Sequence, residues 1–261
     1  MTFSLIYHDV APHGDEDRYG FPGPGAARYK LSPAKFEAHL DAIAATNVDV
    51  GLAADHPGAA LTFDDGGVSA LWIAETLERR GWRGHYFITT GRIGTPGFVG
   101  VGEIRELVRR GHAVGSHSHS HPTYMGALSR DEIAREWHRS RDTLGEIIGA
   151  APATAAVPGG YVSPAVIEEA AHAGYHVLMT SHPRARATRH EGIEVHGRFT
   201  IWASTSPARA AAYARGNHLA RASLWLAWET KSASKRLSPI MYEQVRHLWA
   251  RRQPAMSRKS G

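Results

Sequence analysis

The stretch Leu61–Gly67 (LTFDDGG) decides what kind of fold this chain adopts. An apolar run ends in two adjacent carboxylates, and two glycines then let the backbone turn sharply. A helical pattern closed by Gly81 follows, and His85–Ile88 (HYFI) resumes an apolar strand. This alternation with short connections predicts parallel strands joined by crossover helices.

The same alternation continues along the chain. Ser129 opens a helix with a capping box, and that helix is expected to stop at Gly149. Ser163–Pro164 has the form of a helix start, as do the Ser-Pro pairs at 32–33 and 238–239. An open doubly wound sheet and a closed barrel both fit this pattern. Both place their active residues at the carboxyl ends of the strands.

Length and composition are those of a globular protein with one main domain. The chain has 261 residues, of which 43% are hydrophobic. It contains no cysteine, which excludes disulfides and thiolate metal sites, whereas its 17 histidines make a histidine and carboxylate site worth testing. The pattern becomes helical after about residue 205. We therefore predict a main domain over 1–205 and C-terminal helices with a basic tail over 206–261.

The positive charge is confined to one end of the chain. After residue 230, eight Lys or Arg and one Glu give +7, so the formal net charge of +5 leaves −2 for residues 1–230. A nucleic-acid partner is therefore not expected. The tail is interpreted as a solvated terminus, with weak contact to an anionic membrane surface as the alternative. No apolar run is long enough to span a bilayer, and residues 1–9 resemble a first strand more than a secretion signal, so we predict a cytoplasmic location.

Asp64 and Asp65 form the first candidate site. Two neighbouring carboxylates at the end of a buried strand repel each other unless a cation is present or one of them is protonated. This pair indicates a metal ligand beside an acid or base. A helix N-cap with an acidic neighbour is the alternative interpretation, and the pair alone does not decide between them.

Three histidines in five residues, within residues 117–121, form the second candidate site. In extended chain all three share a face, whereas one helical turn brings only His117 and His121 together. Asp65 with His117 and His121 makes a two-histidine, one-carboxylate set that leaves room for water, which is typical of a catalytic metal site. Asp64 is then placed to take the proton of that water, which predicts hydrolysis of an acyl group.

Residues 62–66 (TFDDG) and 117–122 (HSHSHP) together resemble the first two motifs of the polysaccharide deacetylase family, the NodB homology domain of carbohydrate esterase family 4. The resemblance implies an α/β fold, an irregular (β/α)7 barrel, here with a C-terminal helical appendage. It also implies a divalent metal, with zinc expected and cobalt, manganese or nickel as alternatives. The roles it implies are Asp64 as catalytic base and, as metal ligands, Asp65, His117 and His121.

The third motif departs from the family pattern. Residues 156–161 (AVPGGY) lack the arginine that is implied to tune the base, so Asp64 is tuned differently or catalysis is weaker. Arg198 is a candidate either to replace that arginine or to hold a substrate anion. In the same motif, the backbone N–H of Gly159 is a candidate oxyanion donor, with an ordinary turn as the alternative. Tyr161 is a candidate to stack on a sugar face, with plain packing as the alternative.

The general acid of the family is a histidine on a late strand. His196 is favoured here over His182, although a structural role is an equally good interpretation of it. We predict a metal-dependent hydrolase that removes an N-acetyl group from an amino-sugar-containing saccharide or its cytoplasmic precursor. The alternatives are the same site cleaving a non-sugar amide, a ring amide or an O-acetyl ester, and a saccharide-binding module without turnover. The oligomeric state is not predicted.

Overall fold

The computed structural model describes residues 2–53, 57–160 and 162–237. Its strands are β1 (Thr2–Tyr7), β2 (Val50–Gly51), β3 (Gly58–Phe63), β4 (His85–Ile88), β5 (Ala113–Ser116), β6 (Thr154–Ala156), β7 (Val177–Met179), β8 (Thr188–His190), β9 (Ile193–His196) and β10 (Phe199–Thr200). Its α-helices are α1 (Pro24–Ala27), α2 (Pro33–Ala44), α3 (Ala70–Glu78), α4 (Val101–Arg109), α5 (Arg130–Ile148), α6 (Pro164–His172), α7 (Pro207–Ala214) and α8 (His218–Leu237). Short 3-10 turns are η1 (Glu16–Arg18), η2 (Thr90–Arg92), η3 (Met125–Ala127) and η4 (Pro158–Gly160).

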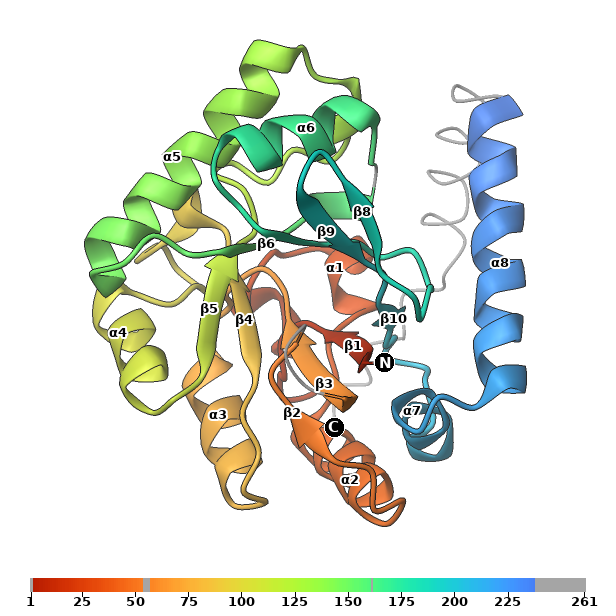
Figure 1. Cartoon of the computed structure of the whole chain (residues 1–261). Coiled ribbons are helices and arrows are strands. Elements are labelled where there is room, and N and C mark those ends of the chain that lie inside the picture. Colours follow the sequence, from red (N-terminus) through yellow and green to blue (C-terminus); the bar gives the residue numbers. More distant parts are fainter. Residues whose placement is uncertain (1, 54–56, 161, 238–261) are drawn as a thin grey trace.

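The strands form one curled sheet with helices on its outer side (Figure 1). Their order is β10-β1-β3-β4-β5-β6-β7-β9-β8, and β2 pairs with β3 beside this path. All pairs are parallel except the β8–β9 hairpin. The predicted α/β fold of the polysaccharide deacetylase type is confirmed as a mostly parallel half-barrel. Short β2, β8 and β10 accompany seven main strands.

Strand alternation separates an outer core from an inner one. On β3, Ala59, Leu61 and Phe63 belong to the large outer core under the helices, and Phe63 stacks on Tyr86 of β4 at 4.9 Å between ring centroids. Ala60 points to the other face and packs in a small cluster with Phe87 and other inner residues. Successive residues of a strand face opposite sides, so the next inward positions on β3 are 62 and 64.

The helix starts predicted from the sequence are confirmed where the structure describes them. The side chains of Ser32, Ser129 and Ser163 each accept a hydrogen bond from the backbone N–H three residues on. Helix α5 ends at Gly149, as predicted from the sequence. Gly149 has a φ of 80°, in the left-handed region that favours glycine. The Ser-Pro pair at 238–239 lies outside the described residues.

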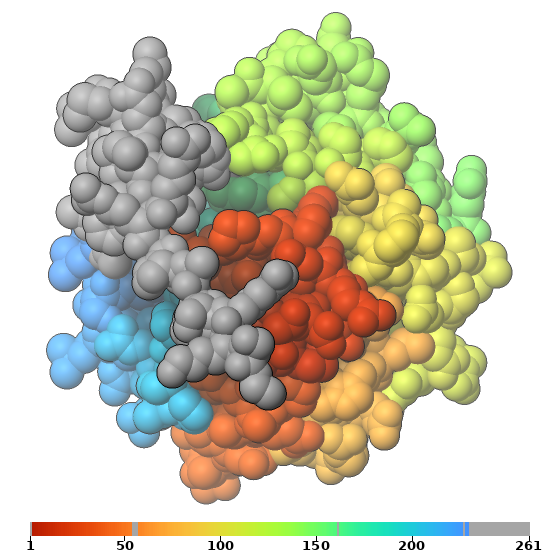
Figure 2. All heavy atoms as spheres, turned by 180° about the vertical axis from the view of Figure 1, so that it is seen from behind, coloured from red at the N-terminus to blue at the C-terminus, as the bar shows by residue number. Residues whose placement is uncertain are grey.

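The last two described helices follow β10. Helix α7 packs on α2 and places Ala210 and Tyr213 in the outer core, so it is joined closely to the rest of the sheet. Helix α8 stands beside the β8–β9 hairpin (Figure 1). From behind, the red N-terminal residues lie between the blue C-terminal helices and the yellow segments near residue 100, as the sheet order requires (Figure 2). The predicted boundary at residue 205 stays a prediction.

Among the described residues, no helix has both the length and the apolar character needed to cross a membrane.

Candidate active site

The candidate site lies where β3 and β5 end. Asp64 continues the inward face of β3, and its backbone N–H donates to the carbonyl of Tyr7 on β1 at 3.0 Å. Asp65 then takes a φ of 76°, followed by Gly66 at 77°, so the chain turns sharply after the strand. A non-glycine residue in this region costs of order 1–3 kcal/mol, and such strain is concentrated at functional sites.

The histidine segment is neither extended nor helical. Ser118 and His121 both have positive φ, 62° and 60°, and these two bends return the chain on itself. Glu136 on α5 holds the turn, because its carboxylate accepts from the backbone N–H groups of His119 and Ser120 at 2.9 and 2.7 Å. His119 points elsewhere, with its Nδ1 3.0 Å from Oγ1 of Thr90.

The turn brings three of the predicted residues together. Oδ1 of Asp65 lies 3.5 Å from Nε2 of His117 and 3.3 Å from Nε2 of His121. Three suitable atoms of these residues lie within 4.8 Å of one another. Ligands about 2.1 Å from a tetrahedral ion stand about 3.4 Å apart, so this spacing matches a divalent metal such as zinc.

The electrostatics of the three side chains also fit a metal. Burial lowers the pKa of His117 to about 4, so its imidazole is neutral at pH 7. Its Nδ1 lies 2.9 Å from the carbonyl of Ala156, which selects the tautomer that donates from Nδ1 and leaves the Nε2 lone pair facing Asp65. Oδ1 of Asp65 is buried and has no hydrogen-bond partner among the described residues. A buried carboxylate oxygen facing an imidazole lone pair calls for a cation between them.

His121 is the third member of the set formed with Asp65 and His117. Burial lowers its pKa, but the contact with Asp65 outweighs burial, so the pKa is raised above its ordinary value. The pKa of Asp65 is lowered in turn: burial raises it, and His121, His8 and His117 together more than offset that effect. The three side chains therefore interact electrostatically with one another, so their protonation is coupled.

Asp64 is held by Arg198 in a two-point contact. Nη1 and Nη2 of Arg198 donate to Oδ1 and Oδ2 of Asp64 at 2.6 and 2.8 Å. Arg198 is only 1% exposed, and it also donates to Thr62 Oγ1 at 3.0 Å and lies over the Phe87 ring. Burial raises the pKa of Asp64, but the guanidinium outweighs burial and holds it below its ordinary value. Of the two roles considered for Arg198, the structure shows the contact with Asp64.

A cavity of about 860 Å³ opens over these groups. This volume falls in the upper part of the range of small-molecule sites. Its lining includes Asp64, Asp65, His117, His121 and Gly159. Tyr124 also lines it. Tyr161, the predicted stacking residue, lies outside the described residues.

His196 lies elsewhere. It ends β9 with Nε2 3.3 Å from Glu194 Oε2, and it lines a smaller neighbouring cavity instead of the larger one. His182, the other candidate, lines that smaller cavity as well. This position does not support either of them as the general acid.

His8 is the functional candidate that the sequence reasoning missed. It follows β1, lines the larger cavity and contacts the ring of Tyr29, with centroids 4.6 Å apart and the ring planes tilted by 32°. Its Nδ1 is buried without a hydrogen-bond partner among the described residues. A positive charge on His8 lowers the pKa of both Asp64 and Asp65, and all three residues line the same cavity. The sequence feature that could have identified it is the polar pair His8–Asp9 directly after an apolar first strand.

Comparison with known proteins agrees with this site. Residues 53–178 match the sequence pattern of the polysaccharide deacetylase family. The peptidoglycan-N-acetylglucosamine deacetylase PgdA of Listeria monocytogenes is 30% identical over 112 residues, which are 42% of this chain and 23% of PgdA. The match thus spans about a quarter of that relative's length.

Solved structures share the fold. A polysaccharide deacetylase from Bacillus cereus has a TM-score of 0.68 at 20% identity, over 81% of this chain and 68% of that one. IcaB from Ammonifex degensii has a TM-score of 0.67 at 23% identity, over 82% and 97% of the two chains. The deacetylase PplD of Streptococcus pyogenes has 0.65 at 19% identity, over 78% and 94%. At these identities the likeness concerns the fold alone.

Proposed function

Because residues 53–178 belong to the polysaccharide deacetylase family, we propose that this protein is a metal-dependent hydrolase that removes an N-acetyl group from an amino-sugar-containing saccharide. The observation that carries the proposal is the convergence of Asp65, His117 and His121 beside the buried carboxylate of Asp64. All four side chains line the larger cavity, which supports a metal site with a proton acceptor beside it.

Asp65, His117 and His121 hold the metal in this proposal. We propose zinc, with cobalt, manganese or nickel as alternatives, because imidazole and carboxylate ligands suit all of them. A divalent ion held by these residues would polarise the amide carbonyl and acidify a water molecule. The N–H of Gly159 is the proposed additional donor to the developing oxyanion.

Asp64 takes the proton from the attacking water. Arg198 keeps this carboxylate ionised at neutral pH, and its fork holds both oxygens in one orientation. Oδ2 of Asp64 lies 3.9 Å from Nε2 of His117, so the base stands directly beside the ligand set. Arg198 thus supplies Asp64 with the guanidinium contact that the third motif, which lacks an arginine, does not provide.

His8 donates the proton to the leaving amine. It lines the larger cavity together with both aspartates, and its ring contacts that of Tyr29. We expect His8→Gln to slow amide cleavage by about 10²–10⁴-fold. Hydrolysis of an aryl acetate should fall much less, because a phenolate leaves without a proton. An equal loss on both substrates would contradict the role.

The proposal also covers the substrate and the cellular location of the protein. The name of PgdA points to an N-acetylglucosamine unit in a glycan, and the cavity has room for a sugar. A cytoplasmic precursor as substrate, and a weak membrane-surface contact of the basic tail, both rest on the sequence. Cell fractionation with and without high salt tests them, since an electrostatic contact is released by salt.

The test combines metal content with acetate release. Wild-type protein is loaded with zinc and incubated with N-acetylhexosamine oligomers, O-acetyl esters and cyclic amides. Asp64→Asn should keep the metal and lose turnover, whereas Asp65→Asn should lose both. Release from esters or cyclic amides alone would favour the other hydrolase functions. Saccharide binding that D64N leaves unchanged, with no acetate released by the wild type, would identify a binding module.

A further inference from the structure

The histidine turn, residues 117–121, depends on contacts from outside itself for its shape. Two of its residues, Ser118 and His121, have left-handed backbone, which is unfavourable for any residue that has a side chain. Such a conformation persists only where the surroundings fix it. The groups that hold this turn therefore decide where the imidazole of His121 stands relative to that of His117.

The segment after β4 holds the carbonyl side of the histidine turn. The backbone N–H groups of Thr90 and Gly91 donate to two of its carbonyls at 3.2 and 2.8 Å. The preceding residue, Thr89, donates to the carbonyl of Asp65 at 3.2 Å. Three successive N–H groups thus connect the backbone at Asp65 with the backbone of the histidine turn.

Gly91 can approach the histidine turn this closely because it has no side chain. A Cβ at this position would lie 2.7 Å from the carbonyl oxygen of His119, which is closer than Cβ atoms come in folded proteins. Backbone therefore packs directly on backbone here. An alanine in place of Gly91 would have to displace the turn.

Glu136 of α5 holds the N–H side of the histidine turn. Its Oε2 accepts from the backbone N–H groups of His119 and Ser120 at 2.9 and 2.7 Å. Its Oε1 accepts from the hydroxyl of Ser120 at 2.6 Å. Hydrogen bonds to a charged acceptor are stronger than those between neutral groups, so this one carboxylate is a firm anchor for the middle of the turn.

The next turn of α5 supports the same segment. Ser140 follows Glu136 by four residues, so the two side chains share one helix face. Ser140 is buried, and its Oγ lies 2.7 Å from Oγ of Ser116. The hydroxyl of Ser116 in turn accepts from the backbone N–H of Ser118 at 3.0 Å. One face of α5 thus supports both the entry and the middle of the histidine turn.

We propose that Glu136 is a positioning residue that sets the affinity of the site for its divalent metal. This inference rests on the proposed function, since it takes Asp65, His117 and His121 as the metal ligands. Glu136 acts through the backbone between the two histidines, and the segment after β4 acts on the other side of the same turn. Groups that orient metal ligands typically contribute about 10–100-fold to metal affinity.

The experiment compares two substitutions of Glu136 that are similar in size. In Glu136→Gln the amide oxygen can still accept from both backbone N–H groups, whereas Glu136→Met has no oxygen to accept them. Glu146→Gln is the matched control, because Glu146 is an exposed carboxylate on the same helix. Gly91→Ala disturbs the turn from the opposite side, and it keeps the test valid if E136M alters folding.

The full chain of each variant is titrated with zinc in competition with a chromophoric chelator. The visible spectrum of the cobalt-loaded protein reports the coordination geometry, which a merely structural role of Glu136 would not change. Acetate release from N-acetylhexosamine oligomers is measured in parallel.

In E136M and G91A, we expect the dissociation constant for zinc to rise by about 10–100-fold and the cobalt spectrum to change, because His121 is then held less firmly. E136Q should remain close to the wild type, and E146Q should not differ from it. Equal zinc affinities in E136M and the wild type would overturn the positioning role. Equal losses in E136M and E136Q would overturn it as well, since the hydrogen bonds would then not be the cause.

The same measurements separate this inference from the proposed function. Zinc binding that is weakened in E136M, with no acetate released by the wild type, would refute the deacetylase and leave the positioning role standing. Acetate release by the wild type, with the zinc affinity and cobalt spectrum unchanged in E136M, would refute the positioning role alone. Absence of both zinc and cobalt binding in the wild type would overturn both.

Discussion

The carboxylate of Asp64 and the guanidinium of Arg198 are almost fully buried, and each is the counter-charge of the other. Removing one partner of such a pair leaves an uncompensated charge in a poorly solvated place. We expect Arg198→Met to lower the free energy of unfolding by about 3–5 kcal/mol, measured by urea denaturation. The same change should raise the pKa of Asp64, because the interaction with Arg198, which lowers it most, is lost while the effect of burial remains.

The double variant D64N/R198M supplies the control. It removes both charges, so it should recover much of the stability that R198M loses, and the coupling energy follows from the double-mutant cycle. Additive effects of the two substitutions would show that the pair is not coupled.

Asp9 is a second buried carboxylate, and burial is the main influence on its pKa. Its Oδ1 accepts from the hydroxyl of Ser69 at 2.7 Å, whereas its Oδ2 is buried with no partner among the described residues. Burial raises its pKa to about 6. Because the folded pKa lies above the unfolded value, the stability from this group is complete below about pH 4 and is lost as the pH rises through 6.

The stability of Asp9→Asn relative to the wild type should therefore increase as the pH rises. Between pH 4.5 and 8, we expect the difference in unfolding free energy to shift in favour of D9N by about 2 kcal/mol, measured by urea denaturation across this range. Parallel stability curves for the two proteins would contradict this account of Asp9.

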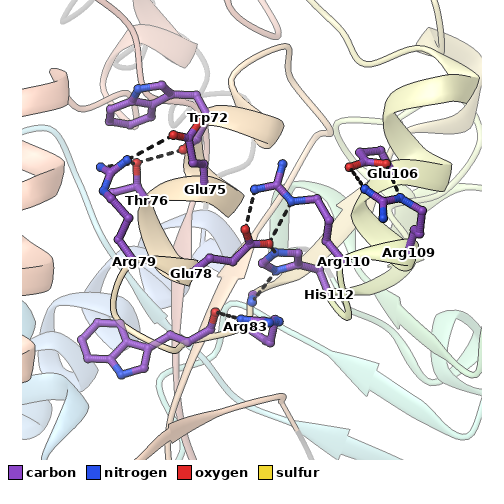
Figure 3. Close-up of polar contacts among 12 residues, drawn as sticks. Trp72, Glu75, Thr76, Glu78, Arg79, Arg83, Glu106, Arg109, Arg110 and His112 are labelled. Atoms are coloured by element: carbon purple, nitrogen blue, oxygen red, sulfur yellow. Dashed lines mark hydrogen bonds and ion pairs between the residues drawn. The ribbon is translucent and has the colours of Figure 1, made fainter.

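At the scale of elements, a polar cluster joins the end of α3 to the end of α4 and the start of β5 (Figure 3). Glu78 accepts from Nε and Nη2 of Arg110 at 2.9 and 2.6 Å, and its Oε1 lies 2.8 Å from Nε2 of His112. Nδ1 of His112 accepts from the backbone N–H of Gly84 at 3.0 Å. One carboxylate thus ties three elements together.

Glu78→Gln is expected to destabilise the protein by about 1 kcal/mol at pH 7, because a partly exposed pair is screened by water. The hydrogen bond from Arg110 lowers the pKa of Glu78 to about 2. The folded pKa lies below the unfolded one, so this stability is present above about pH 4.5 and disappears as the pH falls through 2. Denaturation at several pH values measures it.

Glu106→Gln is the matched control for this prediction. Glu106 also accepts two hydrogen bonds from one arginine, Arg109, but both residues lie on the exposed side of α4 (Figure 3). E106Q should leave the denaturation midpoint unchanged. If E106Q and E78Q lowered the stability equally, the loss in E78Q could not be attributed to the link that Glu78 makes between elements.

At the scale of the whole molecule, metal binding should stabilise the fold, because the ligand set comes from two separate strand ends. Zinc at about 100 times its dissociation constant adds about 2.7 kcal/mol, which corresponds to a rise of roughly 5–10 °C in melting temperature. Differential scanning calorimetry with zinc and with a chelator measures this. Asp65→Asn and His117→Ala should abolish the rise.

His119→Ala provides the control, since His119 lies in the same turn with its Nδ1 against Thr90. H119A should keep the full rise with zinc. A rise of equal size in D65N would place the bound zinc somewhere other than the proposed set.

The features that depend on short-range rules could be predicted from the amino-acid sequence. Alternating strands and helices, serine caps and the left-handed Gly149 are set by local backbone preferences, and the structure has them. The two motifs likewise identified Asp65, His117 and His121 as one candidate set, because the carboxyl ends of parallel strands meet at one edge of the sheet.

Which other side chains reach that edge depends on long-range contacts and could not be predicted from local patterns. Periodicity could not choose between extended and helical histidines, and two positive-φ residues, Ser118 and His121, settled the matter. Arg198 reaches Asp64 across 134 positions of sequence because β10 pairs with β1 and β1 with β3. His8 enters the cavity by the same curling of the sheet, while His196 ends β9 in the smaller cavity. Contacts between residues so far apart depend on how the whole sheet closes, which no local pattern encodes.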